Sequence, residues 1–100
     1  MTEQAVRHVV ISGRVQGVGF RAWMEYHAGK RGLEGWARNC RDGSVEAVFA
    51  GEPRAVGAML EACRNGPPGA WVDKVEHAEA AADQLALRQA GESFSVLPTA

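Results

Sequence analysis

The segment Gly13–Arg21 (GRVQGVGFR) combines residue types that suit the binding of an anion. It follows an apolar run that we predict to be a strand, and it leads into a predicted helix. Its three glycines allow the backbone to approach a ligand closely, and the first N–H groups of a helix have no partner within that helix. A loop that curls into such a terminus can direct several N–H groups at one anion. Arg21 adds a planar cationic group that matches the oxygens of a phosphate.

Two other interpretations of this segment are open. The glycines could form a tight turn with Arg21 merely solvated, but a cation in the first turn of a helix is unfavourable unless an anion is near. The residues Gly17–Ala22 also fit the loose dinucleotide pattern G-x-G-x-x-A. That pattern needs a larger, doubly wound sheet, and the Gly-Lys-Ser/Thr of nucleotide hydrolases does not follow. The segment therefore favours a bound anion over a dinucleotide.

A second segment, Gly35–Asn39 (GWARN), ends in a polar side chain and is followed by the turn sequence Asp42-Gly43. Each of its residues alone has an ordinary structural interpretation. Asparagine is common at turns, Trp36 suits a core, and Arg38 suits a solvated face. The segment gains a functional meaning only if the fold brings Asn39 next to the glycine-rich loop.

Apolar periodicity predicts the elements that carry these segments. Apolar side chains spaced for one face of a helix occur from Phe20 to Ala28 and again from Val56 to Cys63. β-Branched or alternating runs predict strands at residues 6–11, 33–39, 45–50 and 71–78, with a short final strand at 94–97. The alanine-rich stretch Glu79–Glu92 is left open between a loop and a helical turn.

The resulting order, β-α-β-β-α-β plus a terminal strand, predicts an α+β fold of the ferredoxin-like split βαβ type, as one domain over residues 1–100. One sheet would carry both helices on one face. A right-handed crossover through the first helix makes the first two strands parallel, so their carboxyl ends lie at the same edge of the sheet. The glycine-rich loop and Asn39 should therefore meet at that edge.

The composition fits an ordinary globular protein and excludes several classes. Of the 100 residues, 46% are hydrophobic and 23% are charged, and a net charge of −1 gives no electrostatic reason to expect a nucleic-acid partner. No apolar run approaches the ~20 residues of a membrane span, and no export signal is visible. We therefore expect a cytoplasmic protein with Cys40 and Cys63 reduced. His8, His27 and His77 lack the spacing of paired metal ligands.

The two segments together resemble the signature motifs of the acylphosphatase family. Ile11–Arg21 matches that family's N-terminal signature throughout, and Gly35–Asn39 with the residues up to Gly51 matches its second signature at the same spacing. The resemblance covers nearly the whole chain, including the Gly-Pro-Pro turn before the fourth strand. The stretch Glu79–Glu92 and the tail Leu97–Ala100 depart from it.

This resemblance implies specific roles at the site. Arg21 and Asn39 would be catalytic, Arg21 by holding the substrate phosphate and Asn39 by orienting the attacking water with its side-chain amide. The backbone N–H groups that complete the phosphate site would come from Gln16, Gly17, Val18, Gly19 and Phe20. The resemblance also implies that the enzyme uses no metal, no other cofactor and no phosphoenzyme.

The expected partner is a small-molecule acyl phosphate, hydrolysed to a carboxylate and inorganic phosphate, with free phosphate or sulfate as an inhibitor. The leaving carboxylate, whose acid has a pKa of about 4, needs no strong general acid. The loose transition state of phosphoryl transfer needs mainly positioning and charge stabilisation. We expect a monomer with neither a nucleic-acid nor a membrane partner, and nothing in the sequence specifies the acyl group.

Three other functions are compatible with parts of the sequence. A non-catalytic module on the same fold could use the anion loop as a sensor, but it would not need Asn39. An acylphosphatase-like domain of a hydrogenase-maturation carbamoyltransferase would be followed by zinc-finger cysteines, which the sequence lacks. An RNA-binding split βαβ domain would show exposed aromatic residues on its central strands, where Phe49 alone is a weak candidate.

Overall fold

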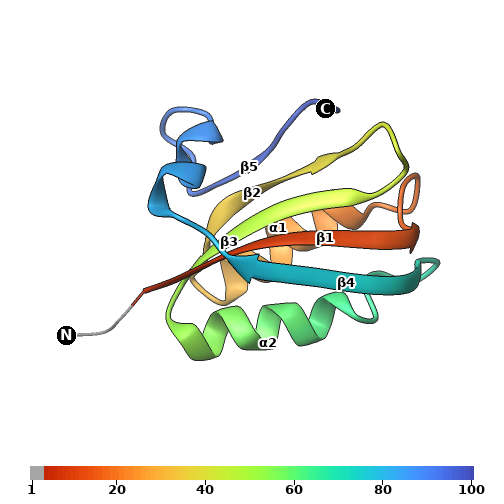
Figure 1. Ribbon diagram of the computed structural model, residues 1–100, viewed down its shortest axis with the longest axis horizontal. Helices are drawn as coiled ribbons and strands as arrows, with labels where there is room; N and C mark the ends of the chain where they lie inside the picture. Colours follow the sequence, from red (N-terminus) through yellow and green to blue (C-terminus); the bar gives the residue numbers. More distant parts are fainter. Residues whose placement is uncertain (1–3) are drawn as a thin grey trace.

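The chain alternates strands and helices in the order that the sequence predicts. The computed structural model describes residues 4–100. Its elements are β1 (Ala5–Arg14), α1 (Phe20–Lys30), β2 (Glu34–Asn39), β3 (Val45–Gly51), α2 (Pro53–Cys63), β4 (Trp71–Glu79), the 3₁₀-helix η1 (Ala82–Leu87) and β5 (Phe94–Val96) (Figure 1). None of the helices in this part of the chain has the length and apolarity that crossing a bilayer requires.

The five strands form one mixed sheet in the order β4-β1-β3-β2-β5. β3 pairs antiparallel with both β1 and β2, so β1 and β2 run parallel with β3 between them. β5 adds to β2 in parallel. The carboxyl ends of β1 and β2 consequently lie at the same edge of the sheet, as predicted, and this edge carries the glycine-rich loop and Asn39.

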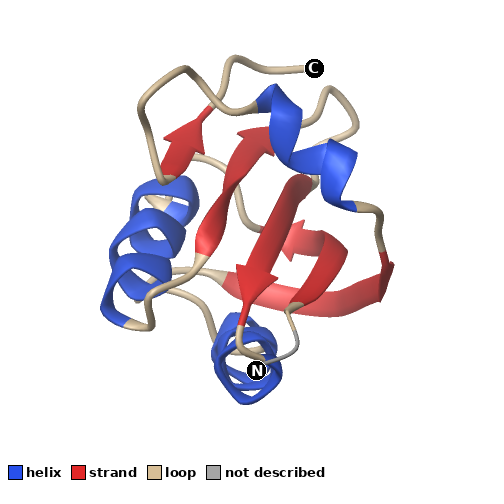
Figure 2. Cartoon of the chain, turned by 90° about the vertical axis from the view of Figure 1, so that its left-hand side faces the viewer, coloured by secondary structure: helices blue, strands red, loops and turns tan. Residues whose placement is uncertain are grey.

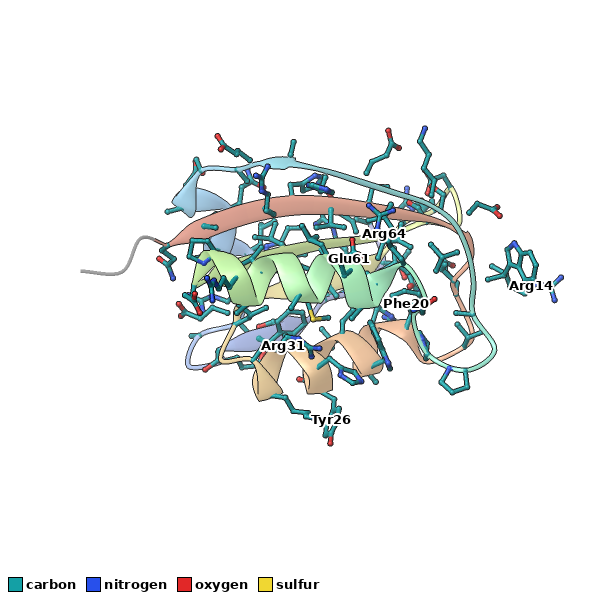
Figure 3. The ribbon with its side chains drawn as sticks, turned by 90° about the horizontal axis from the view of Figure 1, so that it is seen from below. Arg14, Phe20, Tyr26, Arg31, Glu61 and Arg64 are labelled. Atoms are coloured by element: carbon teal, nitrogen blue, oxygen red, sulfur yellow. The ribbon has the colours of Figure 1, made fainter. Side chains whose placement is uncertain are left out.

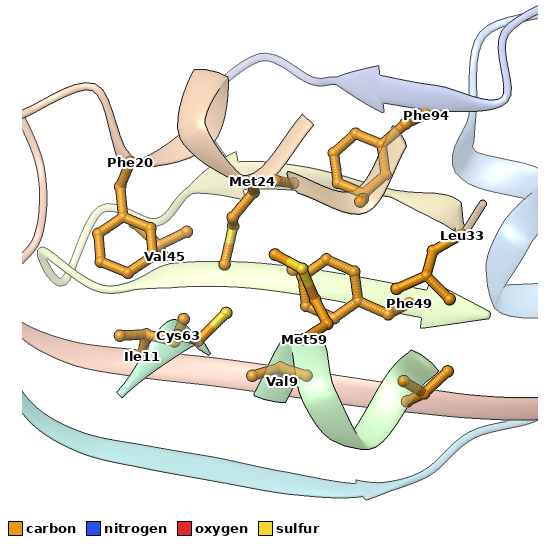
Figure 4. Close-up of a cluster of buried hydrophobic side chains, with 14 of the residues drawn as sticks. Val9, Ile11, Phe20, Met24, Leu33, Val45, Phe49, Met59, Cys63 and Phe94 are labelled. Atoms are coloured by element: carbon orange, nitrogen blue, oxygen red, sulfur yellow. The ribbon is translucent and has the colours of Figure 1, made fainter. Parts of the chain in front are cut away.

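The main core lies between the sheet and the two helices, which cover the same face (Figure 2). The helices bury their predicted faces, including Phe20 and Met24 from α1 and Met59 from α2. These side chains pack with Phe49 of β3 and Phe94 of β5 (Figure 4). Each fully buried large apolar side chain contributes about 1.5–3 kcal/mol. The predicted ferredoxin-like α+β sandwich is confirmed.

A second, smaller cluster lies on the opposite face of the sheet, where η1 packs. Trp36 and Val48 are fully buried there, Leu97 is largely buried beside them, and Leu85 of η1 packs against the cluster. The indole Nε1 of Trp36 donates a 2.8 Å hydrogen bond to the carbonyl of Gln84. The stretch Glu79–Glu92, which the sequence left open, therefore covers part of this face through η1.

Candidate active site

The glycine-rich loop connects β1 to α1 and leaves the start of that helix without a side-chain cap. Gly17 and Gly19 both adopt left-handed backbone conformations, with φ of 76° and 79°. Gly19 is the N-cap of α1, and it has no side chain that could accept a hydrogen bond from the first turn. No side chain caps the first N–H groups of α1, so these groups can donate hydrogen bonds to a bound anion, as the sequence predicts.

Phe20 fixes the position at which α1 begins. Its side chain is 2% exposed and packs into the main core. A Cβ built on Gly66 would lie 2.5 Å from Cε2 of Phe20, so the loop after α2 closes directly over the ring. Figure 3 shows Phe20 near the end of α2, at the end of the molecule that carries Arg14. The core thus anchors the helix terminus that faces the site.

A hollow of about 190 Å³ lies where the loop, α1 and β2 meet. Its lining residues are Val15, Gly17, Gly19, Phe20, Arg21, Ala22, Asn39 and Val96. The structure thus brings together Arg21, Asn39 and three of the five residues expected to offer N–H groups. Val18 instead packs its side chain against the main core, and the side chain of Gln16 reaches a neighbouring turn.

A larger hollow, of about 630 Å³, lies beside the start of the same loop. It is lined by Arg14, Gly69, Ala70, Trp71 and Asp73. It contains neither Arg21 nor Asn39, and the carboxylate of Asp73 would repel a phosphate. We therefore place the candidate site in the smaller hollow.

Arg21 lies in the first turn of α1 and is half-buried. That turn contains no acidic residue, and none of the ion pairs found among residues 4–100 involves Arg21. A half-buried cation beside the positive end of a helix dipole is stabilised by an anion at that place. The electrostatics of the described residues therefore favour a phosphate or a similar group in the hollow.

Asn39 is the last residue of β2 and pairs with Val45 of β3. Its backbone carbonyl accepts a 3.0 Å hydrogen bond from the N–H of Ala100, and the N–H of Arg41 donates to the Ala100 carbonyl at 2.9 Å. The backbone of Asn39 is therefore held on both sides, by β3 and by the tail that continues from β5. Its side chain is left to line the hollow.

The turn between β2 and β3 is closed by its own hydrogen bonds. Oδ1 of Asp42 accepts from the Ser44 hydroxyl at 2.6 Å and from the Ser44 N–H at 2.9 Å. These two donors, the hydroxyl first, lower the pKa of Asp42 below its ordinary value. The N–H of Cys40 donates to the Ser44 carbonyl at 2.9 Å. The chain directly after Asn39 is thus a well-defined turn.

Gln16 connects the glycine-rich loop to this turn. Its side-chain Nε2 donates to the carbonyl of Cys40 at 2.8 Å and to the carbonyl of Ser44 at 2.9 Å. Sequence reasoning missed this contact, because both acceptors are backbone groups that every residue carries. The sequence predicts only a backbone role for Gln16, and the partners of its side chain become evident only in the fold.

Glu46 forms the centre of a polar cluster on the sheet, outside the hollow. His8 Nε2 lies 2.6 Å from its Oε2, and Nε of Arg38 donates to its Oε1 at 2.6 Å. The Arg38 guanidinium also lies over the Trp36 ring, 4.8 Å from its centroid. Burial would raise the pKa of Glu46, but the hydrogen bonds from His8 and Arg38 outweigh burial and lower it. Arg38 therefore has a structural partner of its own.

The described residues contain no group of three or more histidine, cysteine or acidic side chains that could hold a metal ion. Cys40 and Cys63 are both free thiols. Burial raises the pKa of Cys63 to about 12, which keeps this thiol protonated and unreactive.

Comparisons with known proteins point to one family. The family model described as acylphosphatase matches residues 7–94. An acylphosphatase of Bradyrhizobium diazoefficiens is 62% identical over 96% of this chain and 97% of the relative. The structure of an acylphosphatase from Coxiella burnetii superposes with a TM-score of 0.82 at 33% identity, covering 94% of this chain and 93% of that one. A crystal structure of full-length HypF shares the fold, with a TM-score of 0.83 at 24% identity over 12% of its length.

Proposed function

Because this chain belongs to the acylphosphatase family, we propose that it hydrolyses acyl phosphates by direct attack of a water held by Asn39 on a phosphate bound by Arg21 and the loop. The predicted enzyme class, an acylphosphatase, is confirmed by the family match and by the 62% identity to a relative of that name. The mechanism and the residue roles are our proposal.

The proposed reaction balances without a cofactor. A water oxygen forms a bond to phosphorus, and the bond between phosphorus and the acyl oxygen breaks, which releases the carboxylate. One water proton stays on the new P–O–H group, and the other passes to a phosphate oxygen. The products are a carboxylate and dihydrogen phosphate, with the same total charge as the reactants. A carboxylate is a good leaving group, so no general acid is required.

The co-location of Arg21 and Asn39 in one hollow is the observation that carries this proposal. Arg21 and the uncapped N–H groups at the start of α1 are suited to the phosphate oxygens, whose charge is redistributed in the loose transition state. A side-chain amide can accept a hydrogen bond from a water and donate another. Asn39 can therefore hold a water in the hollow from the end of β2.

The remaining properties are proposed from the sequence. We propose a single domain over residues 1–100 that acts as a cytoplasmic monomer, needs no metal, and is inhibited by phosphate or sulfate. The substrate is a small molecule, since the hollow of about 190 Å³ accommodates a phosphate group rather than a large ligand. The acyl group itself stays unassigned.

A steady-state assay with benzoyl phosphate tests the proposal. We expect release of benzoate and phosphate in equal amounts, at a rate that excess EDTA leaves unchanged. Loss of the activity in EDTA, with recovery on adding Mg²⁺ or Zn²⁺, would contradict the metal-free mechanism. Absence of turnover in a folded preparation would contradict the function itself.

A further inference from the structure

We propose that the side chain of Gln16 is a positioning residue that holds Asn39 in register with the phosphate loop. The inference rests on the proposed function and deepens it. It assigns to Gln16 a role that differs from the backbone N–H role expected from the sequence. The role is one of geometry, because the side chain is absent from the lining of the hollow.

The contacts of Gln16 join the glycine-rich loop to the turn after β2, beyond Ile11–Val45, the last pair of the β1–β3 ladder at this edge. Its backbone belongs to the loop between β1 and α1, and its Nε2 donates to Cys40 and Ser44 in the turn after β2. One NH₂ group has two hydrogens, so both are used in these bonds. The bonds measure 2.8 Å and 2.9 Å, close to the ideal length.

The two acceptors lie on either side of the turn that follows Asn39. The first, Cys40, is the next residue along the chain. The second, Ser44, precedes Val45, the residue paired with Asn39. The Ser44 carbonyl also accepts from the N–H of Cys40. Both acceptors therefore lie one residue from the Asn39–Val45 pair, and a shift of the loop relative to the turn would move that pair relative to Arg21.

The effect should fall on turnover more than on phosphate binding. Arg21 and the N–H groups at the start of α1 lie on the loop side and stay together without Gln16. Asn39 lies on the other side. Misplacing a reacting group by about 1 Å can reduce a rate on the order of 100-fold. Loss of the Gln16 contacts should thus lower kcat while leaving the phosphate site intact.

Gln16→Met is the variant that tests this, because methionine has a similar length and no hydrogen-bond donor. We expect kcat with benzoyl phosphate to fall by about 10- to 100-fold, with the inhibition constant for phosphate within about twofold of wild type. In an Asn39→Ala background the same substitution should cause almost no further loss, since two residues acting through one step are not additive. Gln84→Met, at an exposed glutamine in η1, is the matched control and should keep the wild-type kcat.

Three outcomes would overturn the inference. The first is an unchanged kcat in Gln16→Met, and the second is an inhibition constant for phosphate that rises by the same factor as kcat falls. The third is a loss of kcat from Gln16→Met that is as large in the Asn39→Ala background as in the wild-type protein. If Gln16→Met fails to fold, NMR of the wild-type protein decides. Slow exchange of the Gln16 side-chain NH₂ supports the contact, and exchange as fast as that of Gln84 refutes it. A wild-type protein without turnover would instead refute the proposed function.

Discussion

Arg21 and Asn39 line one hollow from two different elements, the helix that follows β1 and the strand β2, and β3 lies between β1 and β2 in the sheet. Arg21 comes from the first turn of α1, and Asn39 is the last residue of β2. The helix holds one group beside its positive terminus, and the strand holds the other at the sheet edge. This separation allows binding of the phosphate and positioning of the water to be altered one at a time.

Substitution of Asn39 by alanine should nearly abolish turnover and leave phosphate affinity almost unchanged. A mispositioned water affects the transition state more than the ground state, and loss of one such group costs on the order of 10²–10³ in kcat. The measurements are kcat and the inhibition constant for phosphate. Asn65→Ala, at an exposed position after α2, should match wild type. If Asn39→Ala kept the wild-type kcat, Asn39 would have only a structural role at the end of β2.

Substitution of Arg21 by alanine or by lysine should remove most of the activity. Lysine keeps the charge but loses the planar group that can bind two phosphate oxygens together. Arg21→Ala should also raise the inhibition constant for phosphate, unlike Asn39→Ala. Arg14→Lys is the matched control, because Arg14 is exposed and points away from the molecule at the same end (Figure 3). Near-normal kcat in Arg21→Lys would show that the planar group is not needed.

Inorganic phosphate or sulfate should inhibit competitively and raise the melting temperature. A ligand at ten times its Kd stabilises the native state by about 1.4 kcal/mol, which corresponds to a Tm increase of roughly 6–11 °C in a domain of this size. Chloride at the same ionic strength controls for screening. The increase should disappear in Arg21→Ala. A Tm that tens of millimolar phosphate leaves unmoved would count against the anion site.

Glu46→Gln should destabilise the fold in a manner that depends on pH. Because the pKa of Glu46 is lowered below its ordinary value of 4.5, the carboxylate stabilises the folded state above pH about 4.5. That stabilisation is lost as the pH falls through the lowered folded-state pKa. At pH 7 we expect a loss of about 1.5–3 kcal/mol, typical of hydrogen bonds to a charged group. Urea unfolding from pH 7 to pH 3 measures the difference, which should shrink at acid pH. A difference that is constant with pH would contradict the role of the charge.

The sequence was sufficient for the elements that bury one regular face. Val9 and Ile11 alternate inward on β1, and Met59 and Cys63 repeat at helical spacing on α2. The alanine-rich stretch was not predictable in this way, because no period marks a six-residue 3₁₀-helix. Its packing depends on a hydrogen bond from Trp36 to the backbone carbonyl of Gln84. Because every residue has a backbone carbonyl, the sequence does not indicate which one will accept this hydrogen bond.

In the candidate site, too, some features could be predicted from residue types and others depend on the fold. The motifs predicted Arg21 and Asn39, and the topology explained why they should meet. The contact of Gln16 with the Cys40 and Ser44 carbonyls depends on the curvature of the loop. The cluster around Glu46 depends on strand register, which places His8 opposite Val48, beside the Val10–Glu46 pair. Residue types alone do not give a register.

The order of the strands also determines when the sheet can be completed during synthesis. Only the β2–β3 pairing among the described residues is a hairpin of consecutive strands; β1 pairs with β3 and β4, and β5 pairs with β2. At about 5–20 residues per second, Glu79, the partner of Arg7, follows the start of β1 by roughly 4–15 s. Until then β1, the strand that supplies Val9 and Ile11, lacks its neighbour β4. One edge of β1 therefore stays unpaired during that interval, and an unpaired strand edge can pair with another chain and aggregate.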